Sequence, residues 1–207
     1  MCRPLVIAHR GASDELPENT LAAFARAIEL GADFVEFDVH PRGERELVVC
    51  HDPPPPAGPE PALGEVLELC RGRIGVMVEL KSPHRYRRRH PVERVLELLD
   101  EEAVFVCFEA GAVARARQLR PGLRTVLNVG SAPVAAAATL GCWAVGLDQT
   151  RASAAAVRRA HLLGLAVAVY TVNDETAMLE LASRGVEAIF TDRPRAALEL
   201  LRPRSAT

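Results

Sequence analysis

Residues 7–52 read IAHRGASDELPENTLAAFARAIELGADFVEFDVHPRGERELVVCHD, and this stretch carries both a fold signal and four polar clusters. Each cluster stands at the end of an apolar run or at the start of a helical pattern: Ala8–Gly11, Pro17–Thr20, Glu36–Val39 and Cys50–Asp52. Two histidines, two carboxylates and an arginine suit metal-assisted phosphoryl transfer, because a cation and an arginine neutralise phosphate oxygens while histidines move protons. We expect the rest of the chain to be the scaffold that holds this site.

The composition of the chain limits its class and its partners. With 25 basic and 27 acidic residues among 207, and a net charge of −2, it has no global field that would draw it to nucleic acid or to an anionic membrane. No run reaches the roughly 20 apolar residues of a membrane span, and the first apolar run starts too close to Met1 for a signal peptide. The cysteines are odd in number and form no CxxC pair, which predicts a reducing compartment: Cys2, Cys50, Cys70, Cys107 and Cys142. We expect one cytoplasmic domain over residues 1–207.

Short apolar runs alternate with helical patterns along the whole chain. Eight runs are expected to be strands: Leu5–Ala8, Phe34–Val39, Val76–Leu80, Val104–Phe108, Thr125–Val129, Ala144–Leu147, Ala166–Val172 and Ala188–Phe190. Several are near-continuous in Val, Ile, Leu or Ala, which is typical of parallel strands covered on both faces. Eight such βα units predict an α/β fold of the TIM-type (βα)₈ barrel class, with a doubly wound sheet as the alternative.

Two local features refine this expectation. Asn19 is expected to cap a helix that runs to Leu30 and stops at Gly31. A ninth apolar run, Leu47–Cys50, follows Val39 too closely for a helical crossover, which predicts an extra antiparallel hairpin strand after strand two. The hairpin would bring His51 roughly opposite Glu36.

Candidate site residues gather at the C-terminal ends of the first three barrel strands, where such barrels carry their functional side chains. The i, i+2 spacing places Glu36 and Asp38 on one face of a strand, and it does the same for Glu79 and Lys81. Three converging carboxylates make an oxygen-rich site for one hard divalent cation, Mg²⁺ or Ca²⁺, and Mn²⁺ also accepts such ligands. The alternative is a structural ion-pair network among Glu36, Asp38, Arg10 and Lys81.

Seven motifs together resemble those of the glycerophosphodiester phosphodiesterase family. They are His9-Arg10-Gly11, Pro17-Glu18-Asn19-Thr20, Gly31-Ala32-Asp33 with Glu36-Phe37-Asp38-Val39, His51-Asp52, Glu79-Leu80-Lys81-Ser82-Pro83, Tyr170-Thr171-Val172-Asn173-Asp174 and Thr191-Asp192-Arg193-Pro194. They run from the first strand to the last in the family's order. The resemblance implies a barrel enzyme that uses a divalent cation to hydrolyse glycerophosphodiesters to glycerol 3-phosphate and an alcohol.

The resemblance also implies roles for individual residues. His9 and His51 would form the general acid and base pair, with the assignment between them open, and Glu36, Asp38 and Glu79 would be the metal ligands. Arg10 and Lys81 would hold phosphate oxygens. Tyr170, where the family often has Trp, would be a substrate-binding aromatic, with a core tyrosine as the alternative. The attacking oxygen, from water or from the glycerol 2-hydroxyl, stays open.

One departure from the family concerns the segment after His51-Asp52. Family members generally carry an insertion of several tens of residues there, whereas residues 53–64 of this chain form a short loop with six prolines. This reduced cap implies a more open pocket and leaves the preferred alcohol open. The reduced cap allows one alternative, a phosphodiesterase for a lysophospholipid or another small phosphodiester. An alternative of another class is a non-catalytic anion-binding barrel, whose mark would be the loss of a histidine or a carboxylate from a set that is complete here: His9, His51, Glu36, Asp38 and Glu79.

The run His84–His90 contains four arginines, Arg85 and Arg87–Arg89, and follows the strand that carries Glu79. A solvated loop is one interpretation, because charge runs usually face water. The other is contact with an anion through Arg85–Arg89, either a second anionic group of the substrate or an anionic lipid surface.

Overall fold

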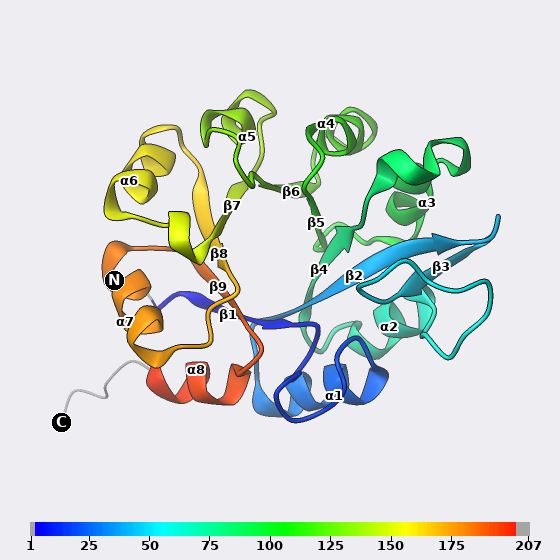
Figure 1. Cartoon of the computed structure of the whole chain (residues 1–207), viewed down its shortest axis with the longest axis horizontal. Coiled ribbons are helices and arrows are strands. Elements are labelled where there is room, and N and C mark those ends of the chain that lie inside the picture. The colour runs from blue at the N-terminus through cyan, green and yellow to red at the C-terminus, as the bar shows by residue number, and fades with distance from the viewer. Residues whose placement is uncertain (1–2, 202–207) are drawn as a thin grey trace.

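Eight parallel strands form a closed ring in this computed structural model, which describes residues 3–201 (Figure 1). Cys2 and the predicted domain limits at 1 and 207 therefore lie outside the described residues. The barrel strands are β1 (Leu5–His9), β2 (Phe34–Arg42), β4 (Gly75–Leu80), β5 (Val104–Cys107), β6 (Arg124–Asn128), β7 (Ala144–Asp148), β8 (Ala166–Tyr170) and β9 (Ala188–Thr191). Because β1 pairs with both β2 and β9, the sheet closes on itself. The predicted TIM-type barrel is confirmed, and the open doubly wound sheet is excluded.

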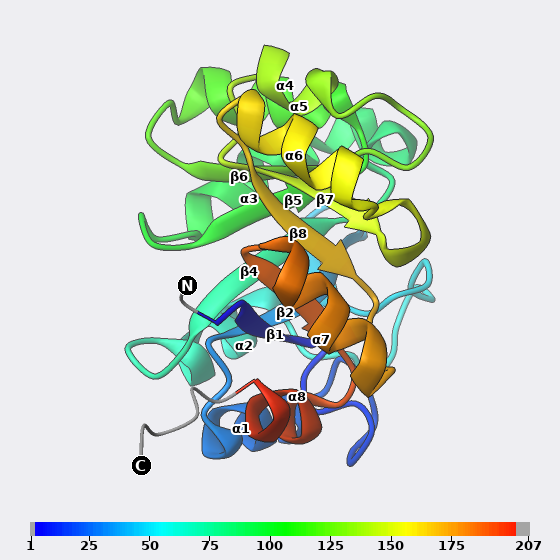
Figure 2. The same cartoon turned by 90° about the vertical axis from the view of Figure 1, so that its left-hand side faces the viewer.

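Helices cover the outside of this ring, as Figure 2 shows for α6, α7 and α8. They are α1 (Leu21–Leu30), α2 (Leu63–Cys70), α3 (Pro91–Leu98), α4 (Ala110–Leu119), α5 (Ala135–Thr139), α6 (Ala154–Leu162), α7 (Glu175–Arg184) and α8 (Pro194–Leu200), with 3₁₀ turns η1 (Pro83–Arg89) and η2 (Gln149–Arg151). Their apolar faces pack on the outward side chains of the strands in one large core. None of the helices described between residues 3 and 201 is long and apolar enough to cross a membrane.

A second, smaller core fills the inside of the ring. Its members alternate along the strands, as side chains of a β-strand must: Ile7, Met77, Val104, Val106, Val126, Ala144, Ala168, Ala188 and Phe190. Two residues further along several of these strands the inward positions become polar. This period of two therefore places polar side chains in the mouth of the barrel, directly above the apolar core inside the ring.

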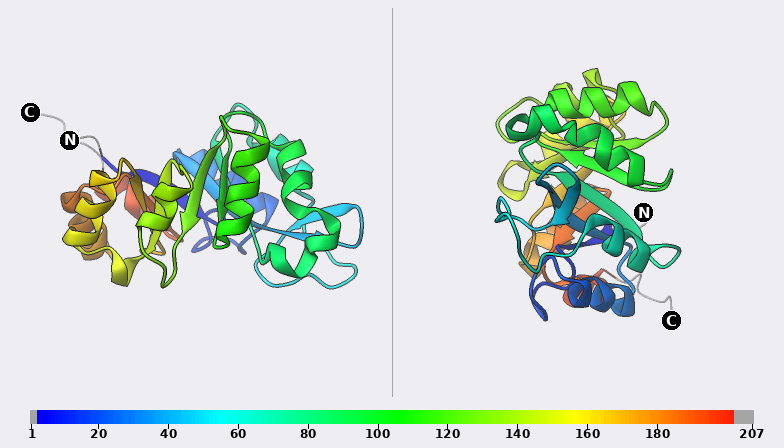
Figure 3. Two further views of the ribbon diagram at one scale, coloured as in Figure 1. Left: turned by 90° about the horizontal axis from the view of Figure 1, so that it is seen from above. Right: turned by 90° about the vertical axis from the view of Figure 1, so that its right-hand side faces the viewer.

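The extra strand predicted after strand two is confirmed. β3 (Glu46–Val49) pairs antiparallel with the end of β2, with Val39 opposite Val49. The hairpin and the loop that follows it project from one side of the barrel (Figure 3). That loop returns to β3 through a bridge between Val48 and Ala62, and α2 starts at Leu63. The segment between the hairpin and α2 is thus a short loop with no helix or strand of its own.

The predicted cap of the first helix is wrong by one residue. Helix α1 begins at Leu21, and Thr20 is its N-cap, with extended backbone angles (φ −114°, ψ 152°) and a side-chain oxygen that accepts a hydrogen bond from the Ala23 amide at 3.2 Å. Asn19 has φ 56°, and its side-chain amide donates to Asp38 Oδ2 at 3.1 Å. Both residue types can cap a helix, but Asn19 is held by a charged partner on β2, which a helix pattern does not reveal. The Gly31 stop is confirmed, with φ 78°.

Candidate active site

The structure brings five of the predicted site residues together at the barrel mouth: Glu36 and Asp38 from β2, Glu79 from β4, and Arg10 and Lys81 just beyond strand ends. The three carboxylates can present one oxygen each within 4.8 Å of one another. Glu36 and Asp38 are each 1 % exposed, and Glu79 is 7 % exposed. Three buried acids at this separation repel one another strongly unless positive charge lies among them.

Two cations partly neutralise this trio. Arg10 Nε lies 3.0 Å from Asp38 Oδ2, and Lys81 Nζ lies 2.7 Å from Glu79 Oε1 and 3.4 Å from Asp38 Oδ1. Burial tends to lower the pKa of Lys81, but Glu79 and Asp38 outweigh it and raise that pKa. Lys81 is therefore charged at neutral pH.

Glu36 receives the least compensation of the three acids. Its Oε2 is buried and has no hydrogen-bond partner among the described residues, and the nearest histidine nitrogen, Nε2 of His9, lies 3.9 Å away. Burial, with the neighbouring Asp38 and Glu79, raises the pKa of Glu36 well above its usual range. Burial also raises the pKa of Glu79, against the opposing effect of Lys81.

This donor set fits a hard divalent cation. Three carboxylates that converge on one point, one of them with an unpartnered buried oxygen, offer the ligands that Mg²⁺ and Ca²⁺ prefer. The structural ion-pair network expected as the alternative is also present around Asp38 and Glu79. Among residues 3–201, however, it leaves Glu36 Oε2 without a hydrogen bond and without an arginine or lysine within 4 Å, so ion pairing alone does not account for the whole trio.

Side-chain amides hold two of the acids in place. Asn19 donates to Asp38 from the loop before α1, and Asn128 Nδ2 donates to Glu79 Oε2 at 3.3 Å from the end of β6. Arg10, Asn19 and Ser82 lie around the same mouth and all have left-handed backbone angles, with φ of 58°, 56° and 43°. Such angles cost about 1 kcal/mol or more for residues with a side chain, and they cluster at functional sites.

His9 points into the mouth with a fixed ring orientation. Its Nδ1 lies 2.7 Å from Asp192 Oδ1, just after β9, and Asp192 also accepts from Asn173 Nδ2 at 2.6 Å and Ser13 Oγ at 3.2 Å. Burial alone would raise the pKa of Asp192. The hydrogen bonds from His9 and Asn173 have a larger opposite effect, so the pKa of this carboxyl is lowered. An ionised carboxylate only accepts, so Nδ1 carries the proton and Nε2 faces Glu36.

His51 lies on the loop after β3 and is anchored through its backbone. The Cys50 amide donates to the Asp38 carbonyl at 3.0 Å, and the His51 carbonyl accepts from His40 Nε2 at 3.0 Å. The His51 ring is about 41 % exposed and its Nδ1 pairs with Asp52 Oδ1 at 3.0 Å. The backbone of the residue before His51 is therefore hydrogen-bonded to the strand that carries Asp38, but the His51 ring pairs with Asp52 and does not contact the three carboxylates.

Tyr170 forms part of an aromatic wall of the mouth. Its ring lies 5.7 Å from the ring of Phe108, edge to face, and Lys81 Nζ lies 5.9 Å from the Phe108 centroid. Burial, with Asp148 and Glu79 nearby, raises the pKa of Tyr170 to about 12. Phe108 is 47 % exposed, which is high for a phenylalanine and leaves apolar surface open at the mouth.

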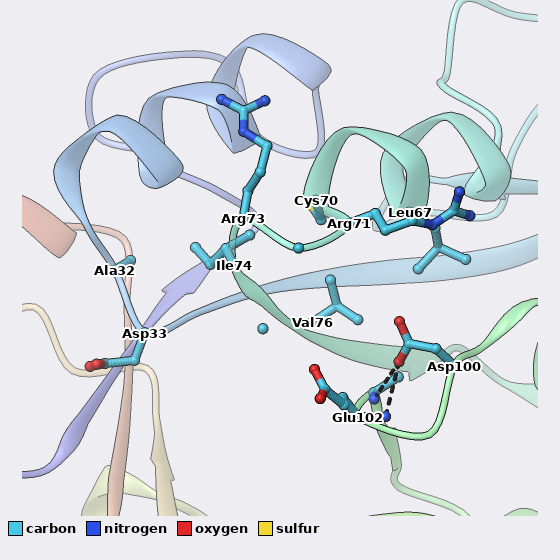
Figure 4. Close-up of a pocket in the computed structure, with 13 residues that line it drawn as sticks. Ala32, Asp33, Leu67, Cys70, Arg71, Arg73, Ile74, Val76, Asp100 and Glu102 are labelled. Atoms are coloured by element: carbon cyan, nitrogen blue, oxygen red, sulfur yellow. Dashed lines mark hydrogen bonds between the residues drawn. The ribbon is translucent and has the colours of Figure 1, made fainter.

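A separate hollow lies at the other end of the barrel and has different chemistry. Its volume is about 380 Å³, and it is lined by the end of α2, the start of β4 and the turn before β5. In that turn Asp100 accepts hydrogen bonds from the amides of Glu102 and Ala103 (Figure 4). These residues belong to the N-terminal ends of the strands, opposite the carboxylate trio. In barrels of this class that end serves stability, so we do not place the active site there.

Sequence reasoning missed four residues of this mouth: Asp192, Asn128, Phe108 and Asp148. Asp192 belongs to the Thr191–Pro194 motif, for which the sequence predicted no function. Each of the other three residues stands at the end of a barrel strand or directly after it. The rule that found Glu36 and Glu79, position at the C-terminal end of a strand, would have found these residues as well.

Comparison with known proteins gives the same picture. The sequence profile of the glycerophosphoryl diester phosphodiesterase family matches residues 9–56 and 65–196, and the interruption falls in the proline-rich loop after His51-Asp52. A putative glycerophosphodiester phosphodiesterase of Bacillus subtilis is 28 % identical over 91 % of this chain and 94 % of its own length. A glycerophosphodiester phosphodiesterase of the same organism is 26 % identical, over 93 % of this chain and 84 % of its length.

A solved structure of similar sequence shares the whole fold. A phosphodiesterase of Oleispira antarctica, in complex with the product sn-glycerol-3-phosphate, superimposes with a TM-score of 0.86 at 26 % identity, over 96 % of each chain. The family profile covers most of the chain, and it includes every strand end that contributes to the mouth. This protein belongs to the glycerophosphoryl diester phosphodiesterase family.

Proposed function

We propose that this protein is a divalent-cation-dependent phosphodiesterase that hydrolyses glycerophosphodiesters to glycerol 3-phosphate and an alcohol. The observation that carries the proposal is the buried trio of Glu36, Asp38 and Glu79 with His9 aimed at it. The product named for the Oleispira antarctica relative supports the substrate class.

Hydrolysis of a diester needs its charge neutralised, an attacking oxygen deprotonated and a leaving alkoxide protonated. Glu36, Asp38 and Glu79 would hold the cation, and Mg²⁺ or Ca²⁺, with Mn²⁺ also accepted, suits these three oxygen donors. When bound, the cation supplies positive charge to the nonbridging phosphate oxygens. Arg10 and Lys81 supply further positive charge from two sides of the same pocket.

His9 and His51 exchange the protons. His9 Nε2 is the free ring nitrogen because Asp192 holds the proton on Nδ1, so His9 can accept a proton or return it at that atom. His51 is exposed and can turn from Asp52 toward a bound diester. The acid and base assignments stay open, and the attacking oxygen comes from water or from the glycerol 2-hydroxyl. If water attacks, its oxygen bonds to phosphorus, the phosphorus–oxygen bond to the alcohol breaks, and glycerol 3-phosphate and the protonated alcohol form in one step. If the 2-hydroxyl attacks, the same bond to the alcohol breaks but the first product is a cyclic glycerophosphate, and water must then add to phosphorus and break the bond to the 2-oxygen to give glycerol 3-phosphate.

Tyr170 and Phe108 orient the organic part of the substrate. A pKa of about 12 keeps the Tyr170 phenol protonated at neutral pH, so its hydroxyl is available as a hydrogen-bond donor. The exposed Phe108 ring offers an apolar face to the carbon chain of glycerol or of the alcohol.

We also propose a cytoplasmic location and a single barrel domain over residues 1–207. Three free thiols, those of Cys70, Cys107 and Cys142, pack in the core, and burial raises their pKa values. Such buried and inert thiols are common in reducing compartments.

The test is release of glycerol 3-phosphate from glycerophosphocholine with EDTA, with Mg²⁺ and with Ca²⁺. We expect release that depends on the cation and is lost in His9→Ala. The matched control is His161→Ala, because His161 lies on the outer helix α6 and pairs with Glu187. Circular dichroism of both variants checks that they fold.

Two other results of this assay would each favour one of the alternative functions. Cleavage of a lysophospholipid or a generic activated diester, without cleavage of glycerophosphocholine, would mean that the reduced cap has changed the substrate. If no diester is cleaved with any cation, the protein is a non-catalytic anion-binding barrel and the proposal is wrong.

A further inference from the structure

The 3₁₀ segment η1 is the most basic part of the barrel mouth. It follows Lys81 and Ser82 directly and contains Arg85, Arg87, Arg88 and Arg89. Arg89 lies 3.5 Å from Glu44, but Arg85, Arg87 and Arg88 have no carboxylate within 4 Å among residues 3–201. These three side chains are exposed. The charges of Arg10 and Lys81, by contrast, are already taken up by Glu18, Asp38 and Glu79.

Two contacts hold η1 against the catalytic side of the barrel. The Tyr86 hydroxyl donates to Nδ1 of His40 at 3.2 Å, and His40 Nε2 donates to the His51 carbonyl. At the other side, His84 Nδ1 pairs with Glu109, which follows β5. The His40 side chain is fully buried and burial lowers its pKa, which agrees with a neutral ring that donates at one nitrogen and accepts at the other. The basic segment is therefore tied to the loop that carries His51.

A cavity of about 500 Å³ opens between η1 and the tip of the β2–β3 hairpin. Apart from Glu44, its lining consists of basic and aromatic side chains: His84, Arg85, Tyr86, Arg87, Arg88 and Arg89. The short loop at residues 53–64 lies beside the hairpin and returns to it through the bridge between Val48 and Ala62 (Figure 3). Because η1 starts two residues after Lys81, which pairs with Glu79 and Asp38, this basic lining continues the chain that leaves the carboxylate trio.

We propose that η1 is a subsite for a second anionic group, such as a phosphate monoester, on the alcohol part of the diester. Guanidinium groups bind phosphate through paired hydrogen bonds, and several together compensate for the weakness of each exposed ion pair. The inference rests on the proposed phosphodiesterase function and names a substrate class for the same site. A doubly charged diester is then preferred over the same diester without the second phosphate.

The experiment compares glycerophosphoinositol with glycerophosphoinositol 4-phosphate, which differ by one phosphate group. We expect wild-type kcat/KM to be about tenfold higher for the 4-phosphate. Combined Arg85→Gln, Arg87→Gln and Arg88→Gln substitutions should bring this ratio close to one. The matched control replaces three exposed arginines away from η1, Arg73, Arg158 and Arg159, by Gln and should keep the wild-type ratio. Added salt should lower the ratio in the wild type and leave it unchanged in the η1 variant.

Binding is also measured without turnover, by calorimetric titration of both diesters into His9→Ala proteins with and without the three η1 substitutions. If the wild type cleaves neither diester, the proposed function fails, while tighter binding of the 4-phosphate that depends on the η1 arginines still supports the subsite. A ratio near one in the wild type, or an η1 variant that keeps the wild-type ratio, would overturn the inference.

A third measurement separates a substrate group from a lipid surface. Sedimentation with phosphatidylserine and phosphatidylcholine vesicles should be equally weak for the wild type and the η1 variant. Vesicle binding that the η1 substitutions abolish, with no change in the diester ratio, would assign these arginines to membrane contact and would also overturn the inference.

Discussion

The His9 ring owes its orientation to one carboxylate at the far end of the chain. Asp192 accepts from His9 Nδ1, and Asn173 and Ser13 in turn hold Asp192. This arrangement fixes the tautomer: Nδ1 carries the proton and binds Asp192, and Nε2, which faces Glu36, is unprotonated. Asp192 is therefore a positioning residue for the proposed acid–base chemistry.

Replacement of Asp192 by Asn tests this role. The Asn amide can donate to Nδ1, which would move the ring proton to Nε2 and remove the free nitrogen from the mouth. We expect kcat for glycerophosphocholine to fall about 10²-fold, within the range that a placed acid–base group contributes, with little change in KM. Asp14→Asn is the control and should keep the wild-type rate, because Asp14 is an exposed residue of the neighbouring loop between β1 and α1 and only its backbone amide contacts Asp192. An Asp192→Asn variant with normal kcat would contradict the assignment.

The same carboxylate should make the protein sensitive to acid. Because the pKa of Asp192 is lowered in the folded state, its stabilising effect is complete above the unfolded pKa of about 4 and is lost as the pH falls through the lowered value. We expect the free energy of unfolding to decline less steeply in Asp192→Asn than in the wild type between about pH 5 and pH 3. Burial raises the pKa of Asp14, so the Asp14→Asn control has the opposite sign and should not flatten the decline. Urea unfolding at several pH values gives the comparison.

At this scale, residue type and strand position predicted which acids meet, but not every partner. Glu36, Asp38 and Glu79 could be placed together because the period of two and the strand ends fix their direction. The role of Asn19 could not be foreseen, since Asn and Thr both cap helices and the choice between them depends on Asp38 across the mouth. The partnership between His9 and Asp192 depends on barrel closure, which no local pattern encodes.

At the scale of elements, one tight strand pairing supports the proposed metal site. Asn128 on β6 lies opposite Gly146 on β7, and a Cβ atom at Gly146 would stand 1.8 Å from Asn128 Oδ1. The missing side chain thus gives Asn128 the space from which it donates to Glu79. Apolar runs located both strands within one residue, but the sequence alone does not show that Gly146 faces Asn128.

Gly146→Ala should therefore disturb the carboxylate trio from a neighbouring strand. The methyl group must displace the Asn128 side chain, and Glu79 then loses its amide donor. We expect a loss of about 1–3 kcal/mol in stability and a weaker response of the melting temperature to Ca²⁺. Gly111→Ala is the control, because a Cβ there meets nothing within 4 Å and Ala favours helix α4. If both variants respond to Ca²⁺ like the wild type, the support from Asn128 is unimportant.

At the scale of the whole molecule, the buried acids at the mouth lower the stability of the fold while offering ligands to the proposed cation. The three buried acids share the positive charge of Arg10 and Lys81, and Glu36, whose Oε2 has no hydrogen-bond partner among residues 3–201, receives the least of it, so its negative charge is the most costly of the three. A protein selected for stability alone would have neutralised or removed that charge. The fold tolerates the cost of this charge because the two apolar cores, one inside and one outside the ring, provide hydrophobic stabilisation.

Glu36→Gln should accordingly stabilise the protein in EDTA. The amide keeps the shape of the side chain and removes the repulsion, so we expect a gain of about 1–2 kcal/mol, or about 2–8 °C in melting temperature. Added Mg²⁺ or Ca²⁺ should raise the melting temperature of the wild type but not of the variant. Glu29→Gln, on the exposed side of α1, is the control. Equal stabilisation of the wild type and Glu36→Gln by either cation would show that Glu36 is not a ligand.

Barrel closure also determines when during biosynthesis the site can form. The ribosome releases β1 first, yet β1 lies between β2 and β9 in the finished sheet, and the carboxylate that orients His9 is 183 residues further along. Contacts of such sequence separation form late, after most of the intervening chain has emerged and collapsed. A nascent chain that ends before β9 lacks Asp192 and with it the hydrogen bond that orients His9. The His9 ring is therefore oriented only once the last strand docks, and a chain that ends before β9 would lack the ring orientation that the proposed acid–base chemistry needs.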